Sequence, residues 1–322
     1  MQDKRVLVTG AGGFIGRWSV PALLGRGCEV HAVLSGKTDR EVPAELAGAM
    51  IHIADLLEDG SADELMGRVN PTHWLHFAWI ATPGVYLSSA ENFRWVSASE
   101  RLLRSFRASG GRRVMMAGTC AEYDWSRAAE CDELESPLAD DRAAALSPYA
   151  ASKIAMQRTL AEFGRREQVS TAWGRIFFQF GPYEHPDRLV PSVIRHLLQD
   201  REAPCSHGRQ IRSFLHVADV GAAFAAVLDS ELEGPVNIGS DERVALADLI
   251  ERIGRQTGRS DLVRLGARPV SSSEPALLVP RIRRLRDEAQ WRPRFTLDEG
   301  LSDTIAWWRG RLREGAAGAD GP

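Results

Sequence analysis

Short apolar runs alternate with segments of helical apolar spacing along the first 180 residues of the chain. The runs that predict buried strands are Arg5–Val8, Glu29–Leu34, Ile51–Ile53, Thr72–Ala78, Arg113–Ala117 and Thr171–Phe178. Amphipathic helices are expected between them, at Phe14–Arg26, Asp63–Val69, Ala90–Ser109 and Pro148–Arg166. Because strands that alternate with helices favour right-handed βαβ crossovers, the pattern predicts an α/β fold around a doubly wound parallel sheet.

The first predicted strand leads directly into a turn with glycines at positions 10, 12, 13 and 16. Gly10 can adopt the positive φ of a tight turn. Gly13 lets the backbone approach a pyrophosphate, and Gly16 lets the following helix pack closely on the strand. The N–H groups at the N-terminus of that helix favour a bound pyrophosphate. The turn therefore predicts a Rossmann-type dinucleotide site, and a turn that only joins strand to helix is the alternative.

The alternation loosens after residue 180, where prolines at 182, 186, 191 and 204 interrupt the chain. Strands are expected at Phe214–Val217 and Val236–Ile238, and helices at Pro191–Gln199, Val220–Asp229, Leu246–Thr257 and Leu297–Arg311. We expect residues 1–180 to form the Rossmann domain, with 211–240 returning to it. Residues 181–210 and 241–312 are expected to form a smaller, interleaved α/β substrate domain. The Gly/Ala-rich residues 313–322 are expected to be a disordered tail.

The composition, with 44% hydrophobic and 26% charged residues, is that of an ordinary globular protein. The net charge of −3 gives no reason to expect a nucleic-acid partner. No apolar run approaches the roughly 20 residues of a membrane span, and no leader-like segment opens the chain. The four cysteines lack the spacing of a metal site or a disulfide framework. We therefore expect a cytoplasmic protein with reduced thiols, no metal and no membrane contact.

A tyrosine and a lysine stand four residues apart at the start of the helix predicted from Pro148. At this spacing Tyr149 and Lys153 project from one face of the helix. The pKa of a free tyrosine, about 10, is too high for acid–base catalysis at neutral pH, and a neighbouring ammonium group would lower it. Y-x-x-x-K alone is more often part of an ordinary amphipathic helix. Behind a glycine motif, it predicts a catalytic pair.

Together the two motifs resemble those of the extended short-chain dehydrogenases/reductases, the group that includes nucleotide-sugar epimerases, dehydratases and 4-ketoreductases. The resemblance extends from residue 5 to about residue 311. It includes Gly118-Thr119, Arg175 to Pro182, Arg212 to Val220 and Val236 to Ser240. It implies that Thr119 hydrogen-bonds the reacting oxygen beside Tyr149 and that Lys153 holds the nicotinamide ribose. A threonine that bonds only its own backbone is the alternative. The resemblance also implies a homodimer through the helices Ala90–Ser109 and Pro148–Arg166.

The resemblance further implies a set of binding residues. For the cofactor these are Gly10, Gly12, Gly13, Phe14, Ile15, Gly16, Asp55, Leu56, Phe77, Ala78, Tyr149 and Lys153, and for the substrate Trp79, Thr119, Phe178, Arg209 and Arg212. Asp55 would accept a hydrogen bond from the adenine amino group. Arg212 would bind the diphosphate of a nucleotide sugar, because a guanidinium suits a phosphate bidentately. An ion pair at a domain boundary is the alternative for Arg212, and packing within its loop is the alternative for Trp79.

One departure from the family pattern concerns the reaction. Nucleotide-sugar 4,6-dehydratases follow the catalytic threonine with an Asp-Glu pair. Here Cys120 and Ala121 stand in those places, and Glu122 comes one residue too late. Without the two carboxyl groups, no proton donor serves the leaving group at C6. We therefore reject dehydration.

A second departure concerns the cofactor. Leu34 stands at the end of the second strand, where NAD-using relatives carry an acid that binds the ribose 2′-hydroxyl. Ser35, Lys37 and Arg40 follow it, and they would favour a 2′-phosphate. The alternative is that these charges are only solvated. We therefore expect NADP(H) in preference to NAD(H), with Ser35 and Lys37 among its ligands.

These observations predict an NADPH-dependent reductase of the 4-keto group of a nucleotide-activated 6-deoxyhexose, with Tyr149 as the proton donor. Phe178 replaces a substrate-binding Asn of relatives, and Ser213 replaces an Asp. These replacements keep a reductase of a non-sugar ketone as one alternative. The others are an NAD-retaining nucleotide-sugar epimerase and a cofactor-binding sensor without turnover. The complete set of Thr119, Tyr149 and Lys153 argues against the sensor.

Overall fold

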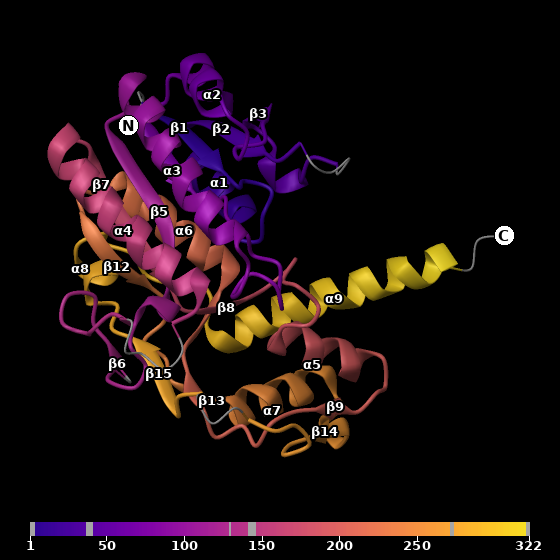
Figure 1. Cartoon of the computed structure of the whole chain (residues 1–322). Helices are drawn as coiled ribbons and strands as arrows, with labels where there is room; N and C mark the ends of the chain where they lie inside the picture. Colours follow the sequence, from indigo (N-terminus) through magenta and orange to yellow (C-terminus); the bar gives the residue numbers. More distant parts are fainter. Residues whose placement is uncertain (1–3, 37–40, 129, 141–145, 271–273, 320–322) are drawn as a thin grey trace.

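A seven-stranded parallel sheet forms the centre of the computed structural model, which describes residues 4–36, 41–128, 130–140, 146–270 and 274–319. Its strand order is β12-β7-β5-β4-β1-β2-β3, and every neighbouring pair is parallel (Figure 1). The strands are β1 (Arg5–Thr9), β2 (Glu29–Leu34), β3 (Met50–Ile53), β4 (His73–His76), β5 (Arg113–Thr119), β7 (Ser170–Ile176) and β12 (Gly234–Ile238). The predicted Rossmann-type, doubly wound sheet is confirmed.

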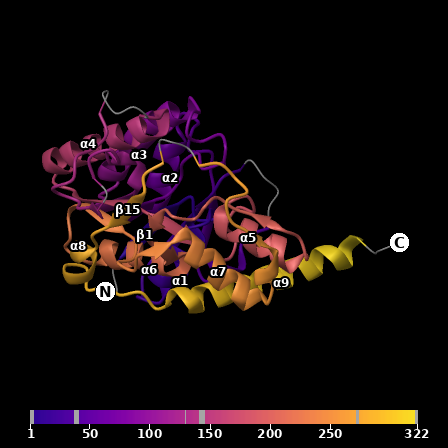
Figure 2. The ribbon, with the colours of Figure 1, turned by 90° about the horizontal axis from the view of Figure 1, so that it is seen from below.

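Helices cover both faces of this sheet. One face carries α1 (Gly16–Leu24) and α6 (Val217–Asp229), and the other carries α2 (Ser61–Val69), α3 (Glu91–Ala108) and α4 (Pro148–Glu167). Figure 2 shows the two sets on opposite sides of β1. α6 and β12 follow residue 210 in the chain, yet β12 pairs with β7 and α6 packs on α1. The chain therefore returns to the sheet after leaving it.

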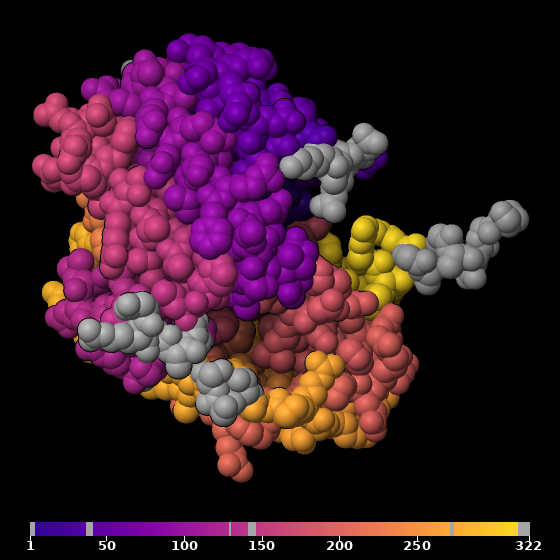
Figure 3. Space-filling view, in the orientation of Figure 1, coloured from indigo at the N-terminus to yellow at the C-terminus, as the bar shows by residue number. Residues whose placement is uncertain are grey.

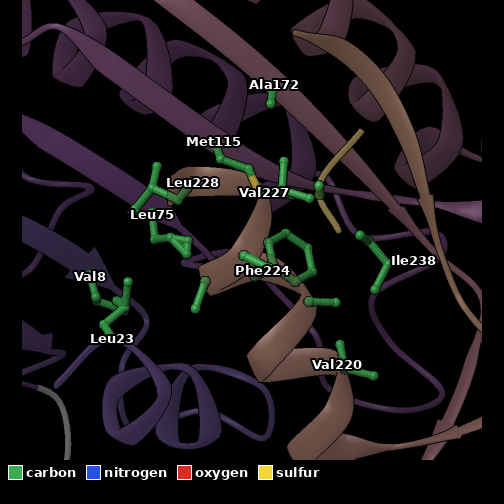
Figure 4. Close-up of a cluster of buried hydrophobic side chains, with 14 of the residues drawn as sticks. Val8, Leu23, Leu75, Met115, Ala172, Val220, Phe224, Val227, Leu228 and Ile238 are labelled. Atoms are coloured by element: carbon green, nitrogen blue, oxygen red, sulfur yellow. The ribbon is translucent and has the colours of Figure 1, made fainter. Parts of the chain in front are cut away.

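The core between α6 and the sheet consists mainly of apolar side chains. Phe224 of α6 is fully buried and lies close to Met115 and Leu75 (Figure 4). A Cβ atom at Gly174 of β7 would lie 2.7 Å from the Phe224 ring and 2.8 Å from the methyl group of Met115. Glycine at this position therefore lets the aromatic ring lie directly against the strand.

Residues that follow β7 in the chain build a separate apolar core. α5 (Leu189–Leu198), α7 (Leu246–Thr257) and α9 (Leu297–Ala319) enclose it with residues such as Val193, Ile253 and Leu301. The short elements are β6 (Glu130–Cys131), β8 (Phe178–Phe180), β9 (Ala203–Pro204), β10 (Ile211–Arg212), β11 (Phe214–His216), β13 (Val244–Ala245), β14 (Val263–Arg264), β15 (Leu277–Pro280), α8 (Arg283–Asp287) and the 3-10 turns η1 (Ala44–Leu46), η2 (Cys120–Glu122) and η3 (Ser260–Leu262). Figure 3 shows a hollow between the two halves of the molecule. We keep the two-domain division given above as a proposal.

The C-terminal segment corrects one prediction. Residues 313–319 are helical rather than disordered, because α9 continues to Ala319 and extends away from the body of the molecule (Figure 1). Adding residues to an existing helix avoids the cost of nucleation, and alanine has the highest helix propensity. An ion pair between Arg311 and Glu314 joins neighbouring turns. Residues 320–322 lie outside the described residues.

Candidate functional site

The glycine turn lies at the carboxyl end of β1, beside β4, where the strand order reverses. This switch point is the usual ligand crevice of an open α/β sheet. Gly10 has a φ of +73°, and a Cβ atom there would lie 2.7 Å from the backbone N of Ala78. A Cβ atom at Gly16 would lie 2.2 Å from the carbonyl oxygen of Gly10. Glycine is therefore required at both positions: at 10 by the positive φ of the turn, and at 16 by the close packing of the helix start on the turn.

The outer side of the turn fits a dinucleotide pyrophosphate. Gly13 is exposed, and the carbonyl oxygen of Gly10, at 3.2 Å, is the nearest atom that a Cβ atom there would meet. No side chain caps the N-terminus of α1 at Ile15, which leaves this end of the helix available to an anion. Arg17 braces the turn by donating to the carbonyl of Gly12 at 3.1 Å. Gly12, Gly13, Phe14 and Ile15 therefore form the open end of the turn, where the sequence predicts the pyrophosphate.

The residues predicted to bind the adenosine end lie at the ends of β2 and β3. Leu34 closes over the turn, since one of its methyl carbons lies 2.9 Å from where a Cβ atom of Gly12 would be. Ser35 follows it and is exposed. Asp55 accepts a hydrogen bond from the backbone N of Leu57 at 3.1 Å, and Leu56 is buried. Lys37 and Arg40, predicted beside a 2′-phosphate, lie outside the described residues.

Tyr149 and Lys153 lie in the first two turns of α4. Ser147 begins this helix by accepting a hydrogen bond from the backbone N of Ala150, and Pro148 follows at a position that needs no N–H partner. The buried ammonium group of Lys153 donates to the carbonyl of Ala117 at 2.8 Å and lies 3.7 Å from the centre of the Trp79 ring. The start of α4 therefore places Tyr149 and Lys153, the predicted catalytic pair, against the end of β5.

Burial shifts the pKa values of both groups. It lowers the pKa of Lys153 to about 7, against the opposing charge of Glu122. It also raises the pKa of Tyr149 above its ordinary value, and the nearby Tyr86 adds to this shift. The expected lowering of the tyrosine pKa by Lys153 is therefore wrong for this structure. The ammonium group lies 5.9 Å from the centre of the Tyr149 ring, and desolvation of the phenol is the larger effect.

Thr119 is the last residue of β5, and its hydroxyl group hydrogen-bonds Tyr149. The same oxygen accepts from the backbone N of Ala121 at 3.2 Å, so Thr119 also caps the short turn η2. The structure thus brings together the two hydroxyl groups that the resemblance assigns to the reacting oxygen. The backbone role that was the alternative for Thr119 coexists with this contact.

The carboxylate of Glu122 is fully buried and turned into the protein. It accepts hydrogen bonds from the backbone N of Thr119 at 2.8 Å, the Trp173 indole at 2.9 Å and the Arg175 guanidinium at 2.8 Å. Burial, with the charge of Glu122, raises the pKa of the neighbouring Cys120 thiol to about 12. The Cys120 thiol is therefore not suited to exchange a proton with a substrate at neutral pH, and the Glu122 carboxylate is engaged by donors inside the protein.

The residues expected to contact substrate have different surroundings. The Trp79 indole donates to Asn92 of α3 at 2.8 Å, while its ring covers the ammonium group of Lys153 on α4. Its role toward a substrate stays a prediction. Phe178 faces Arg212, with 5.4 Å between the guanidinium carbon and the ring centre. Arg209 is exposed. Tyr86, from the same loop as Trp79, packs at 4.8 Å against the ring of Tyr149.

Arg212 is only 2% exposed, and its partners are internal. Its guanidinium donates to Glu274 at 3.0 Å, to the carbonyl of Pro275 at 2.8 Å and to that of Ile211 at 2.8 Å. This is the ion pair that was the alternative to diphosphate binding. The sequence analysis passed over Glu274, which no local spacing links to Arg212. It also passed over Glu184, a buried carboxyl group whose pKa burial raises to about 8.

Comparison with known proteins places the chain among sequence relatives. The sequence model described as "NAD dependent epimerase/dehydratase family" matches residues 6–239. The chain belongs to this family. One family relative, a dTDP-glucose 4,6-dehydratase of Streptomyces niveus, is 27% identical over 322 residues, which cover 95% of this chain and 93% of the relative. A UDP-glucuronic acid decarboxylase 1 of Arabidopsis thaliana is 23% identical over 328 residues, 96% of this chain and 70% of the relative.

Solved structures agree with this family assignment. The UDP-glucose 4-epimerase of Thermus thermophilus, in complex with NAD, has a TM-score of 0.77 at 26% identity. The match covers 95% of this chain and 99% of the epimerase. The predicted resemblance is thereby confirmed, and the protein is an enzyme of a nicotinamide-dependent family. In the described parts of the chain, no helix has the length and apolarity to cross a membrane, and no three His, Cys, Asp or Glu side chains gather as a metal site would require.

Proposed function

We propose that this member of the epimerase/dehydratase family reduces the 4-keto group of a nucleotide-activated 6-deoxyhexose with NADPH. The observation that carries the proposal is the set of Thr119, Tyr149 and Lys153 without an acid pair for elimination. Glu122 is held by Trp173 and Arg175, and so it supplies no proton to a leaving group. Such a site can transfer a proton and a hydride at one carbon.

The protein's part in the reaction follows from two neighbouring hydroxyl groups, those of Thr119 at the end of β5 and Tyr149 on α4. A nicotinamide bound beyond the glycine turn supplies the hydride chemistry. Thr119 and Tyr149 would both hydrogen-bond the substrate carbonyl oxygen. Its raised pKa keeps Tyr149 protonated at neutral pH, so Tyr149 donates its proton as negative charge develops on that oxygen. Lys153 in its charged form would stabilise the phenolate that remains.

The choice of cofactor rests on the end of β2. NAD-using relatives carry an acidic residue at this place, and its charge would repel a 2′-phosphate. Leu34 and Ser35 stand there instead, and the absence of an acid favours NADPH. A reductase consumes NADPH, whereas an epimerase re-reduces its own intermediate and retains NAD. The Thermus epimerase, which is 26% identical and holds NAD, makes the NAD-retaining epimerase the second candidate.

The relatives support a nucleotide-sugar substrate, because their names refer to UDP- and dTDP-linked sugars. We also propose a homodimer through α3 and α4, as the family resemblance implies. Phe93 on α3 is 57% exposed, so its ring is available to a partner helix. A sedimentation mass equal to that of one chain would refute the dimer.

Thermal shift measurements test the assignment. The purified protein is melted with NADPH, NADH and NAD, each alone and with dTDP, UDP, GDP or CDP. Stabilisation by NADPH together with one nucleotide, followed by NADPH oxidation with the corresponding 4-keto sugar, is the expected result. Protein that already carries NAD and does not oxidise NADPH would instead be an epimerase. Stabilisation by NADPH without any response to nucleotides would indicate a non-sugar ketone.

A further inference from the structure

The guanidinium of Arg212 forms an ion pair with a carboxylate from a loop that is distant in the sequence. Glu274 precedes β15, and β15 runs parallel to β10, the strand that carries Arg212. One oxygen of Glu274 accepts from Arg212 at 3.0 Å, and the other accepts from the Gln210 amide at 3.3 Å. Both oxygens of the carboxylate are therefore engaged by one short strand region.

The pair lies beside the catalytic residues. The positive charge of Arg212 acts on the thiol of Cys120, the residue that follows Thr119. The ring of Phe178 also faces the guanidinium, at 5.4 Å. A substrate that reached from Thr119 and Tyr149 toward Cys120 would therefore bring its remaining groups toward Arg212.

The two partners differ in exposure. The side chain of Arg212 is 2% exposed and that of Glu274 is 38% exposed. Burial lowers the pKa of Arg212, and Glu274 opposes this shift, so the guanidinium is poorly hydrated and depends on an anionic partner. Glu274 can turn into solvent, whereas Arg212 is also fixed by the carbonyls of Ile211 and Pro275.

We propose that Glu274 sets the affinity of the site for a substrate diphosphate, by holding Arg212 until the diphosphate displaces it. This inference rests on the proposed function, in which Arg212 meets the diphosphate of a nucleotide sugar. The exchange keeps one anion on the guanidinium in both states, so Arg212 is never left buried without a counter-charge. A neutral substrate cannot make this exchange. Glu274 therefore acts as a specificity-determining residue.

Binding of inorganic pyrophosphate to the whole chain saturated with NADP⁺ tests the proposal. Saturation keeps pyrophosphate away from the glycine turn. Glu274→Gln keeps the shape of the side chain but removes its charge. It should bind pyrophosphate about tenfold more tightly than the unaltered protein, the worth of one competing charge-assisted hydrogen bond. Glu274→Ala should also bind pyrophosphate about tenfold more tightly. With two variants, the test can still be made if one of them does not fold.

Two controls connect the effect to Arg212. Glu202→Gln removes an exposed carboxylate that is likewise paired with an arginine, Arg264, and it should leave the affinity unchanged. Arg212→Lys combined with Glu274→Gln should lose the tenfold gain, because an ammonium cannot bind a diphosphate bidentately.

Equal or weaker pyrophosphate binding by Glu274→Gln and Glu274→Ala, at unchanged melting temperatures, would show that Glu274 only positions Arg212 and would overturn the inference. Failure of the proposed function is a separate result. In that case no nucleotide sugar is turned over, while the gain in pyrophosphate affinity persists.

Discussion

Replacing Glu122 by glutamine tests whether this residue serves structure or chemistry. Every group facing its carboxylate is a donor: the backbone N of Thr119, the Trp173 indole and the guanidinium of Arg175. Whichever way a glutamine amide is turned, its NH₂ group meets one of these donors. Arg175, itself 2% exposed, also loses the only carboxylate among its partners in the described structure.

The magnitude follows from this burial. Breaking a buried ion pair by neutralising one partner costs about 3 to 5 kcal/mol of unfolding free energy. For a chain of this size, that loss lowers the melting temperature by about 5 to 10 °C. Glu162→Gln is the matched control, because Glu162 also pairs with arginines, Arg165 and Arg166, but at the surface. It should leave the melting temperature unchanged.

Calorimetry and turnover are measured on the same preparations. The structural role predicts a large fall in melting temperature for Glu122→Gln, with catalysis retained by the fraction that stays folded. An isosteric variant that melts like the unaltered protein but has lost turnover would refute the reasoning. That result would indicate that Glu122 takes part in the reaction, and dehydration would again be a candidate activity.

Three further predictions concern the catalytic pair and the cofactor. Tyr149→Phe removes the proton donor and should reduce single-turnover reduction by at least about a hundredfold; unchanged turnover would contradict the mechanism. Lys153 has a folded pKa of about 7 against 10.5 for the free group, so folding releases a proton between these values. The unaltered protein should therefore gain unfolding free energy relative to Lys153→Met as pH rises from 7, by up to about 1.4 kcal/mol per pH unit; parallel urea-unfolding curves would exclude the shift. Lys37→Ala should weaken NADPH binding more than NADH binding in fluorescence titrations, and equal effects on both would remove the 2′-phosphate assignment.

Local pattern was enough to predict most of the sheet and the helix that carries Tyr149 and Lys153. The helix predicted at Leu246–Thr257 has those bounds, and β2 was predicted as Glu29–Leu34. Such elements depend on apolar spacing within a few residues, which the sequence displays directly. Gly10 and Gly16 were predictable for the same reason, because their constraints come from a single turn. The prediction of a disordered tail was wrong for residues 313–319. It considered the Gly-rich composition of the segment but not the helix that precedes it and continues into it.

The contacts that decide what the site can do are long-range. Glu122 meets Arg175 across 53 residues, and Arg212 meets Glu274 across 62. Neither partner can be identified from spacing, because each pair forms only when separate strands are brought side by side. In both cases burial of an arginine fixes the role of a carboxylate. At β5 this keeps a carboxylate engaged inside the protein, and at β10 it places a more exposed carboxylate on Arg212, the residue that we propose to bind a diphosphate. The distinction between the two pairs is exposure: Glu122 is fully buried and cannot leave its arginine, whereas Glu274 is 38% exposed and can.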